Sequence, residues 1–234
     1  MTSLARDPLY RRHRFPADVI ARAVWLYFRF PLSLRMVEDM LAERGITVSH
    51  QTIRLWAEKF GRLFANNIRR RSVSRLGDKW HLDEVVVTVR GKKQWLWRAV
   101  DPLDVLVQSR RNAKAAKRLM RKLLKRQGHT PRVMITDELR SYNAAKRDIM
   151  PGVEHRSHKG LNNRAENSHQ PIRRRERIMK RFKSPRQLQR FVSIHDPIAN
   201  LFHIPRHDIP SHHHRELRGA AMQMWSEIAH LQAA

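Results

Sequence analysis

The sequence has no cysteine and comparatively few acidic side chains. Without cysteine, the 234-residue chain forms no disulfide bonds and no thiolate metal sites, so a metal ion must be held by oxygen or imidazole ligands. Asp and Glu number 21 against 48 Lys and Arg, which gives a formal net charge of +27. A positive excess this large, spread along the chain, favours a polyanionic partner such as nucleic acid or an anionic membrane surface.

Long hydrophobic runs are also absent. The longest uninterrupted apolar stretch is 23–28, whereas a membrane-spanning helix needs about 20 predominantly apolar residues. The first residues lack the apolar segment and the small-residue cleavage site of a secretory signal. We therefore expect DNA rather than a membrane as the partner, and a cytoplasmic location.

Residues 1–66 are predicted to form an N-terminal arm followed by three helices. We interpret 1–15 as a mobile arm because it is polar and basic. Apolar residues then recur at helical spacing in three segments, which begin after Pro16, Ser33 and Ser49. The second and third segments are joined by a turn that contains glycine, which is typical of a helix-turn-helix.

The third of these helices is the candidate DNA-reading element. Gln51 and Arg54 lie in its first turn, opposite the apolar stripe. In the major groove, glutamine can read adenine and arginine can read guanine. The alternative is a three-helix bundle that packs against the rest of the protein, but the positive charge favours DNA.

The remaining sequence predicts a linker, an α/β domain and an appendage. Residues 67–78 are rich in arginine and are interpreted as an irregular linker along backbone phosphates. From 79 to 204, three hairpin-linked strands are followed by alternating helices and strands. Residues 205–234 end in a further helical pattern without an assigned role. The predicted strands span 81–89, 94–100, 105–109, 133–137 and 153–157, and the helices span 113–127, 141–149, 163–177 and 184–202.

Three acidic residues are candidates for one catalytic site. Asp83 lies in the first strand, Asp137 ends the fourth, and Glu166 lies on the helix after the fifth. In an open α/β sheet, functional groups gather at strand ends and in the crevice beside them. Carboxylates held together there can bind two Mg²⁺ or Mn²⁺ ions about 4 Å apart, an arrangement that supports in-line attack on a phosphate.

Other acidic residues remain open as alternatives. Glu84 and Glu138 are immediate neighbours and could be the ligands instead, although strand alternation puts Glu84 on the opposite face from Asp83. Glu154 is a more distant candidate. The acids at positions 101 and 104 lie in a predicted turn, where aspartate is common without any function.

A cationic cluster surrounds the third acid. Because they adjoin the proposed metal site, five residues are expected to contact DNA phosphates, although a solvated basic helix face is the alternative. These residues are Lys159, Arg173, Arg174, Arg175 and Arg177.

The aromatic and histidine side chains nearby permit two interpretations each. His169 could orient a ligand or touch the scissile phosphate, or it could be a surface histidine. Trp95 and Trp97 could stack on an unpaired base, but tryptophans two apart on a strand are more often part of a core. The histidines at 212–214 are interpreted as an exposed loop.

Four sequence blocks together carry a family resemblance. They are W-H-L-D-E at 80–84, I-T-D at 135–137, L-N-N-R-A-E-N-S-H-Q-P-I-R-R-R-E-R at 161–177 and M-K-R-F-K-S at 179–184. With these blocks and the helix-turn-helix, the chain resembles a DDE transposase of the bacterial insertion sequence six family from about residue 12 to 207. The third block is the most specific of the four.

The resemblance implies an α/β fold: an RNase H-like catalytic core with a mixed five-stranded sheet, preceded by an all-α helix-turn-helix. It implies that Asp83, Asp137 and Glu166 are the metal-binding triad. It also implies recognition of terminal inverted repeats, 3′-end strand transfer and cointegrate formation at the bacterial nucleoid. Because a transposase must hold two DNA ends, at least a dimer on DNA is expected.

One departure and two alternatives accompany this interpretation. Residues 138–165 separate the second and third acids, a few residues fewer than in many relatives, which affects the loop around 149–153. A non-catalytic DNA-binding protein, either a regulator or an inactive transposase, would share the helix-turn-helix and the charge. A nuclease or resolvase would share the metal ions but would hydrolyse DNA rather than join it.

Overall fold

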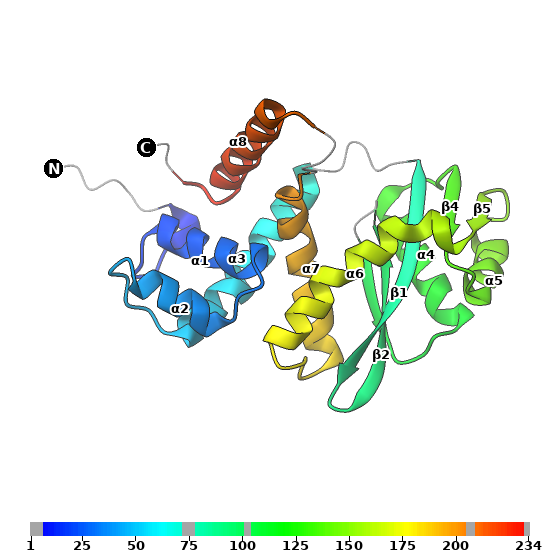
Figure 1. The fold of residues 1–234 in the computed structure, drawn as a ribbon, viewed down its shortest axis with the longest axis horizontal. Helices are drawn as coiled ribbons and strands as arrows, with labels where there is room; N and C mark the ends of the chain where they lie inside the picture. The colour runs from blue at the N-terminus through cyan, green and yellow to red at the C-terminus, as the bar shows by residue number, and fades with distance from the viewer. Residues whose placement is uncertain (1–6, 72–77, 101–103, 205–208, 232–234) are drawn as a thin grey trace. The chain divides into compact units, whose positions relative to one another are not determined.

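The computed structural model describes residues 7–71, 78–100, 104–204 and 209–231 (Figure 1). The chain divides into two compact units. One unit combines 1–71 with 194–234, and the other comprises 72–193. The division falls inside helix α7, Pro185–Leu201.

The first unit is helical, as the apolar periodicity predicts. Ser33 caps its second helix by accepting a hydrogen bond from the Met36 amide at 3.1 Å. Gly45 turns the chain between the second and third helices with a φ of 73°, a conformation that glycine adopts without strain. The helices are α1 (Ala17–Arg29), α2 (Leu34–Ala42), α3 (His50–Arg71) and α8 (Ser211–Ile228).

Both ends of the first unit differ from the sequence expectation. The predicted mobile arm is wrong for residues 7–15: a 3₁₀ helix, Pro8–Tyr10, places the Tyr10 ring 5.1 Å from that of Phe60. The C-terminal segment is not a separate appendage either, because Trp225 of α8 packs on Phe64 with ring centroids 5.1 Å apart. Aromatic burial outweighs the polar composition of both segments.

The predicted linker also begins later than expected. Arg69, Arg70 and Arg71 form the last turn of α3, so they are helical rather than irregular. Cations are favourable there because the C-terminal end of a helix carries partial negative charge. The expected linker residue Arg75 lies outside the described residues.

The second unit is built on a mixed five-stranded sheet, which confirms the expected fold class. The sheet order is β3-β2-β1-β4-β5. The first three strands form an antiparallel meander, whereas β4 and β5 run parallel to β1. The strands are β1 (Lys79–Val89), β2 (Lys92–Ala99), β3 (Asp104–Gln108), β4 (Val133–Thr136) and β5 (Glu154–Ser157).

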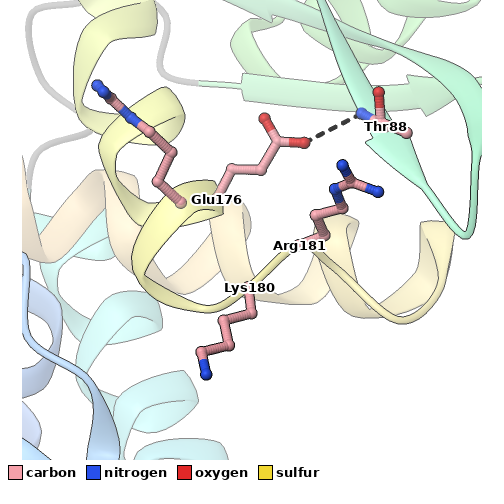
Figure 2. Close-up of a pocket in the computed structure, with 5 residues that line it drawn as sticks. Thr88, Glu176, Lys180 and Arg181 are labelled. Atoms are coloured by element: carbon pink, nitrogen blue, oxygen red, sulfur yellow. Dashed lines mark hydrogen bonds between the residues drawn. The ribbon is translucent and has the colours of Figure 1, made fainter.

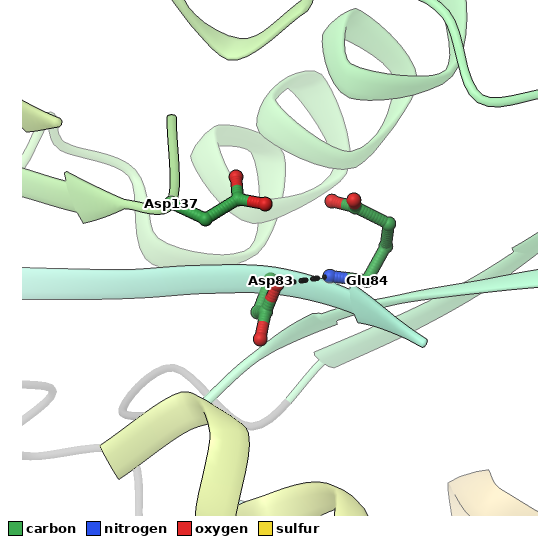
Figure 3. A group of neighbouring side chains, drawn as sticks. All are labelled: Asp83, Glu84 and Asp137. Carbon is green, nitrogen blue, oxygen red and sulfur yellow. Dashed lines mark hydrogen bonds between the residues drawn. The ribbon is translucent and has the colours of Figure 1, made fainter. Parts of the chain in front are cut away.

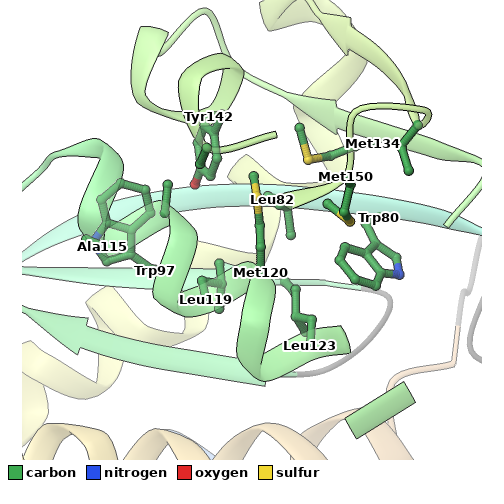
Figure 4. Close-up of a cluster of buried hydrophobic side chains, with 14 residues drawn as sticks. Trp80, Leu82, Trp97, Ala115, Leu119, Met120, Leu123, Met134, Tyr142 and Met150 are labelled. Carbon is green, nitrogen blue, oxygen red and sulfur yellow. The ribbon is translucent and has the colours of Figure 1, made fainter. Parts of the chain in front are cut away.

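Helices α4 (Ala113–Gln127) and α5 (Arg140–Ile149) cover one face of this sheet (Figure 4). Asn112 caps the start of α4, and Gly128 ends it at a φ of 77°. An aliphatic stripe on α4 packs against tryptophans and leucine from β1 and β2. The buried side chains of this cluster include Trp80, Leu82, Trp97, Ala116, Leu119, Met120, Leu123 and Tyr142.

Helix α6 (Asn163–Ile178) lies on the other side of β1, after a short 3₁₀ helix, Lys159–Asn162.

The backbone of the edge strand β3 is hydrogen-bonded by a side chain from α7. Gln189 accepts a hydrogen bond from the Val107 amide at 2.8 Å and donates one to the Val105 carbonyl at 3.0 Å. These bonds satisfy part of the backbone of an otherwise open edge. Within the described residues, no helix is long and apolar enough to cross a membrane.

Candidate active site

The carboxylates of Asp83 and Asp137 meet because β4 ends beside the middle of its parallel neighbour β1. Leu82 of β1 is paired with Thr136 of β4, so the residues that follow each of them become neighbours. Asp83, Glu84 and Asp137 each offer a carboxylate oxygen, and these oxygens lie within 4.8 Å of one another (Figure 3). The predicted meeting of the two aspartates is therefore present, with Glu84 as a third member.

Asp83 is turned toward α6. The residue is nearly buried, at 6% exposure, and its Oδ1 accepts a hydrogen bond from the Glu84 amide at 2.8 Å. Its Oδ2 lies 2.8 Å from Nε2 of His169, a buried side chain on α6. His169 is therefore not a surface histidine: it fixes the orientation of one carboxylate of the site.

Glu84 and Asp137 lie on the opposite side of β1 from the Asp83 carboxylate (Figure 3). Arg111 bridges them: its Nη2 is 2.6 Å from Glu84 Oε1 and 3.4 Å from Asp137 Oδ2. The guanidinium carbon of Arg111 also lies 5.1 Å from the centre of the Trp95 ring. Strand alternation predicts opposite faces for Asp83 and Glu84, and the acids still approach because Glu84 reaches the strand end where Asp137 lies.

Burial and mutual repulsion raise the pKa values of Glu84 and Asp137. Burial, followed by the nearby Asp137 carboxylate, raises the pKa of Glu84 to about 7, although Arg111 opposes the shift. Burial also raises the pKa of Asp137, and the Asp83 carboxylate adds to that rise. The pKa of Tyr142, which is fully buried beside them, rises well above its ordinary value through burial and then through Glu84. Negative charge is therefore in excess here.

Helix α6 is attached to β1 by polar side chains spaced seven residues apart. That spacing is two helical turns, so the three side chains share one face, with buried Ala165 and Ile172 between them. Arg98 of β2 adds a hydrogen bond to the Ser168 carbonyl. The three contacts are Asn162 Nδ2 to Leu82 O at 3.0 Å, His169 Nε2 to Asp83 Oδ2 at 2.8 Å, and the Thr88 amide to Glu176 Oε1 at 3.1 Å.

This attachment places the backbone of Glu166 between the contacts that α6 and its preceding residue make to Leu82 and Asp83. Glu166 lies in α6 between two of the residues that hold the helix on β1, Asn162 and His169. The side chain of Glu166 lies outside the described part of the chain, as does that of Lys159. The membership of Glu166 in the site stays a prediction.

The arginines of α6 do not share one environment. Arg173, Arg174 and Arg177 are exposed, whereas Arg175 is 2% exposed and stacks its guanidinium on the Phe191 ring at 5.1 Å. Successive helical residues are rotated by about 100°, so four neighbours cannot all face solvent or DNA. Arg175 is buried where a phosphate does not reach it, which contradicts its expected DNA contact.

The other acidic and aromatic candidates have structural partners. Asp104 accepts a salt bridge from Lys122 at 2.6 Å, and Glu154 pairs with Arg156 at 2.7 Å. Trp97 is fully buried, as expected of a core residue, while Trp95 is only partly buried beneath Arg111. The sequence interpretation missed Arg111, because its role depends on which strands are neighbours.

The candidate reading residues of the first unit are accessible. Gln51 and Arg54 are both exposed near the start of α3. The preceding residue, His50, lies 3.2 Å from Glu38 of α2, which joins the two helices. The helix-turn-helix outline is therefore present with its predicted reading positions open.

Comparisons with known proteins decide the family. A family model described as a DDE domain matches residues 77–204. "Transposase for insertion sequence-like element IS431mec" of Staphylococcus aureus strain Mu50 is 30% identical over 176 residues, which cover 71% of this chain and 78% of that protein. The chain belongs to the insertion sequence six family of DDE transposases.

Two further matches were found for this transposase. "Transposase for insertion sequence element IS257 in transposon Tn4003" of Staphylococcus aureus is also 30% identical over 176 residues, with the same coverage. The cryo-EM structure of a simian T-cell lymphotropic virus intasome in complex with PP2A regulatory subunit B56 gamma matches with a TM-score of 0.34 and 12% identity. It covers 57% of this chain and 58% of that one, a likeness too loose to carry an argument.

DDE transposases use divalent metal ions, and the acidic group fits such an ion. All its donor atoms are hard carboxylate oxygens, the type that Mg²⁺ and Mn²⁺ prefer. Glu84 Oε2 is buried and has no hydrogen-bond partner within the described residues. A divalent cation at this place would relieve the repulsion that raises the pKa values of Glu84 and Asp137.

Proposed function

We propose that this transposase binds the terminal inverted repeats of its insertion sequence and joins their 3′ ends to target DNA, which produces cointegrates. The main support is the meeting of Asp83, within β1, and Asp137, at the end of the parallel strand β4, with α6 bonded to Asp83 through His169. Asp83, Asp137 and Glu166 are the proposed metal ligands. Two Mg²⁺ ions, or Mn²⁺ in their place, are the proposed cofactors.

The proposed reaction is a transesterification. The oxygen of the transposon 3′-hydroxyl forms a bond to a target phosphorus, and the bond from that phosphorus to the target 3′-oxygen breaks. Bound divalent ions would make the attacking oxygen more nucleophilic and stabilise the charge on the leaving oxygen. Within the protein, His169 keeps Asp83 oriented, and Asp83 and Glu84 are both nearly buried.

Two sets of residues are proposed to bind DNA. Gln51 and Arg54 would read bases of the terminal repeat in the major groove. The exposed arginines of α6, which are Arg173, Arg174 and Arg177, and also Lys159 would contact phosphates and make binding depend on salt. Because two ends are joined in one event, we propose that at least two copies of the chain assemble on DNA.

Replacement of Asp83 by Asn tests the catalytic proposal. Labelled DNA that carries the element's own ends is incubated with Mg²⁺ and a target duplex, and joined product is measured. We expect Asp83→Asn to lower joining on the order of a thousand-fold or more while end binding in EDTA is retained. The matched control is Glu154→Gln, an exposed acid paired with Arg156, which should join normally. Normal joining by Asp83→Asn would contradict the proposal.

A further inference from the structure

A pocket lies where the C-terminal end of α6 and the turn after it meet Thr88 of β1 (Figure 2). It measures about 490 Å³ and is lined by one acid and three cations together with Thr88. The acid, Glu176, is already engaged with the Thr88 amide at 3.1 Å. With three cations and one acid, the lining has a net positive charge that attracts an anion. Its residues are Thr88, Glu176, Arg177, Lys180 and Arg181.

The backbone at this pocket adopts an unusual conformation. Lys180 and Arg181 have φ angles of 49° and 72°, in the left-handed region that side chains other than glycine rarely occupy. The turn is fixed by hydrogen bonds from Arg181 N to Glu176 O at 2.8 Å and from Lys180 N to Arg177 O at 3.0 Å. Phe182, which follows, is buried and bridges to Val89. Glycine commonly ends helices in this conformation, yet two long cationic side chains are found here.

The two cationic side chains are directed differently. Arg181 extends from the turn toward Thr88 and the Glu176 carboxylate, whereas Lys180 extends from the opposite side of the turn (Figure 2). Both are exposed. Strain of this kind persists where the surrounding structure holds it, and it is concentrated at functional sites. Arg181 is therefore the residue whose position calls for a ligand.

We propose that this pocket binds one backbone phosphate of duplex DNA, with Arg181 as the principal donor and Arg177 beside it. The inference rests on the proposed function, because it takes DNA as the substrate. A guanidinium offers several N–H donors in a planar arrangement that matches phosphate oxygens. Fixing the turn between the end of α6 and buried Phe182 orients that donor before DNA arrives.

The fold also sets where along the DNA this phosphate lies. Thr88 is five positions beyond Asp83 on β1, a separation of roughly 17 Å at about 3.4 Å per residue. Successive phosphates along one strand of duplex DNA advance by about 3.4 Å along the helix axis. For a duplex whose axis runs along β1, the bound phosphate is thus about five nucleotides from the one that reacts at the carboxylates. It belongs either to the transposon end or to the target duplex.

The first test separates strain from charge. Wild type is compared with four variants by thermal unfolding and by the fluorescence anisotropy of labelled DNA, in EDTA at several salt concentrations. The variants are Arg181→Gly and Arg181→Gln, with Lys180→Gly and Lys180→Gln as their matched controls. Both glycine variants should raise Tm by a few degrees, because the left-handed strain is relieved. Both Arg181 variants should lower the slope of log K against log salt by about one unit, and the Lys180 variants by clearly less.

The second test locates the phosphate. Single neutral methylphosphonates are placed along a duplex with the element's end and along the target part of a joined-product duplex. A substitution about five nucleotides from the joined phosphate should weaken binding about tenfold in wild type and have no effect in Arg181→Gln. The duplex that shows this effect identifies the source of the phosphate.

Two results would overturn the phosphate site. One is an equal loss of salt slope in the Arg181 and Lys180 variants. The other is that Arg181→Gln removes the methylphosphonate effect at no position. Both assays measure binding without metal, so they do not depend on joining. Failure of wild type to bind either duplex would instead contradict the proposed function itself.

Discussion

Helices α4 and α6 both cover the sheet, but they attach to it by different chemistry. Helix α4 packs through an aliphatic stripe that includes Leu119 and Leu123. Helix α6 attaches through Asn162, His169 and Glu176, each bonded to β1. Apolar packing is non-directional and stabilises by burial, whereas hydrogen bonds require defined distances and angles. We infer that α4 mainly stabilises the fold and that α6 mainly positions the chemistry.

Replacement of Glu166 by Gln should produce the largest effect and should leave the fold intact. The change keeps the size of the side chain but removes a proposed metal ligand, so strand transfer should fall on the order of a thousand-fold or more. Tm and binding to end DNA in EDTA should stay close to wild type. Undiminished joining by Glu166→Gln would remove α6 from the catalytic account.

Replacement of Leu119 by Ala should have the opposite pattern. Leu119 is fully buried in the α4 cluster, so its truncation should lower the free energy of unfolding by about 2–5 kcal/mol. Denaturant unfolding measures this loss. The joining rate per folded molecule at low temperature should change little. Arg121→Ala, at an exposed position of α4, is the control and should change neither quantity. A selective loss of joining would show that α4 also positions the site.

Replacement of Glu84 by Gln should change the pH dependence of stability. Since folding raises the pKa of Glu84 from 4.5 to about 7, its contribution to stability is fully present below pH 4.5 and is lost as pH rises through about 7. The neutral variant lacks this loss. In EDTA, the stability of the variant relative to wild type should therefore rise between pH 5 and pH 8 by on the order of 3 kcal/mol. Parallel pH profiles would contradict the raised pKa.

Replacement of His169 by Ala should have the smallest of these effects. The variant loses the bond that orients Asp83, so Mn²⁺ affinity, followed by electron paramagnetic resonance, should fall about tenfold. His169→Gln retains a side-chain N–H donor and should recover part of that affinity. Equal affinity in wild type and both variants would assign His169 to packing alone.

Local sequence patterns predict the apolar helix α4 and the meeting of the two aspartates. Apolar spacing and Gly128 predict α4 with the bounds that the structure has, because a helix is specified by its own residues. Asp83 and Asp137 could be paired in advance because adjacent central strands of an open α/β sheet bring their acids together.

What the sequence does not predict depends on partners distant in the chain. Arg111 reaches Glu84 and Asp137 only because β4 lies beside β1, and no local pattern distinguishes it from the preceding Arg110. Arg175 lies in a run of cations that suggests a single exposed face, although helix rotation turns it onto Phe191. Tyr10 belongs to a basic segment, yet its ring packs on Phe60.

The parallel pairing of β1 with β4 has a consequence for the order in which the protein acquires activity. Parallel neighbours require a long crossover, and here it comprises β2, β3 and α4. A chain still emerging from the ribosome holds Asp83 without its partner acid until the whole crossover has been synthesised and folded. Contacts between such remote residues form slowly. An incomplete chain therefore lacks the assembled carboxylate group that is proposed to hold the metal ions.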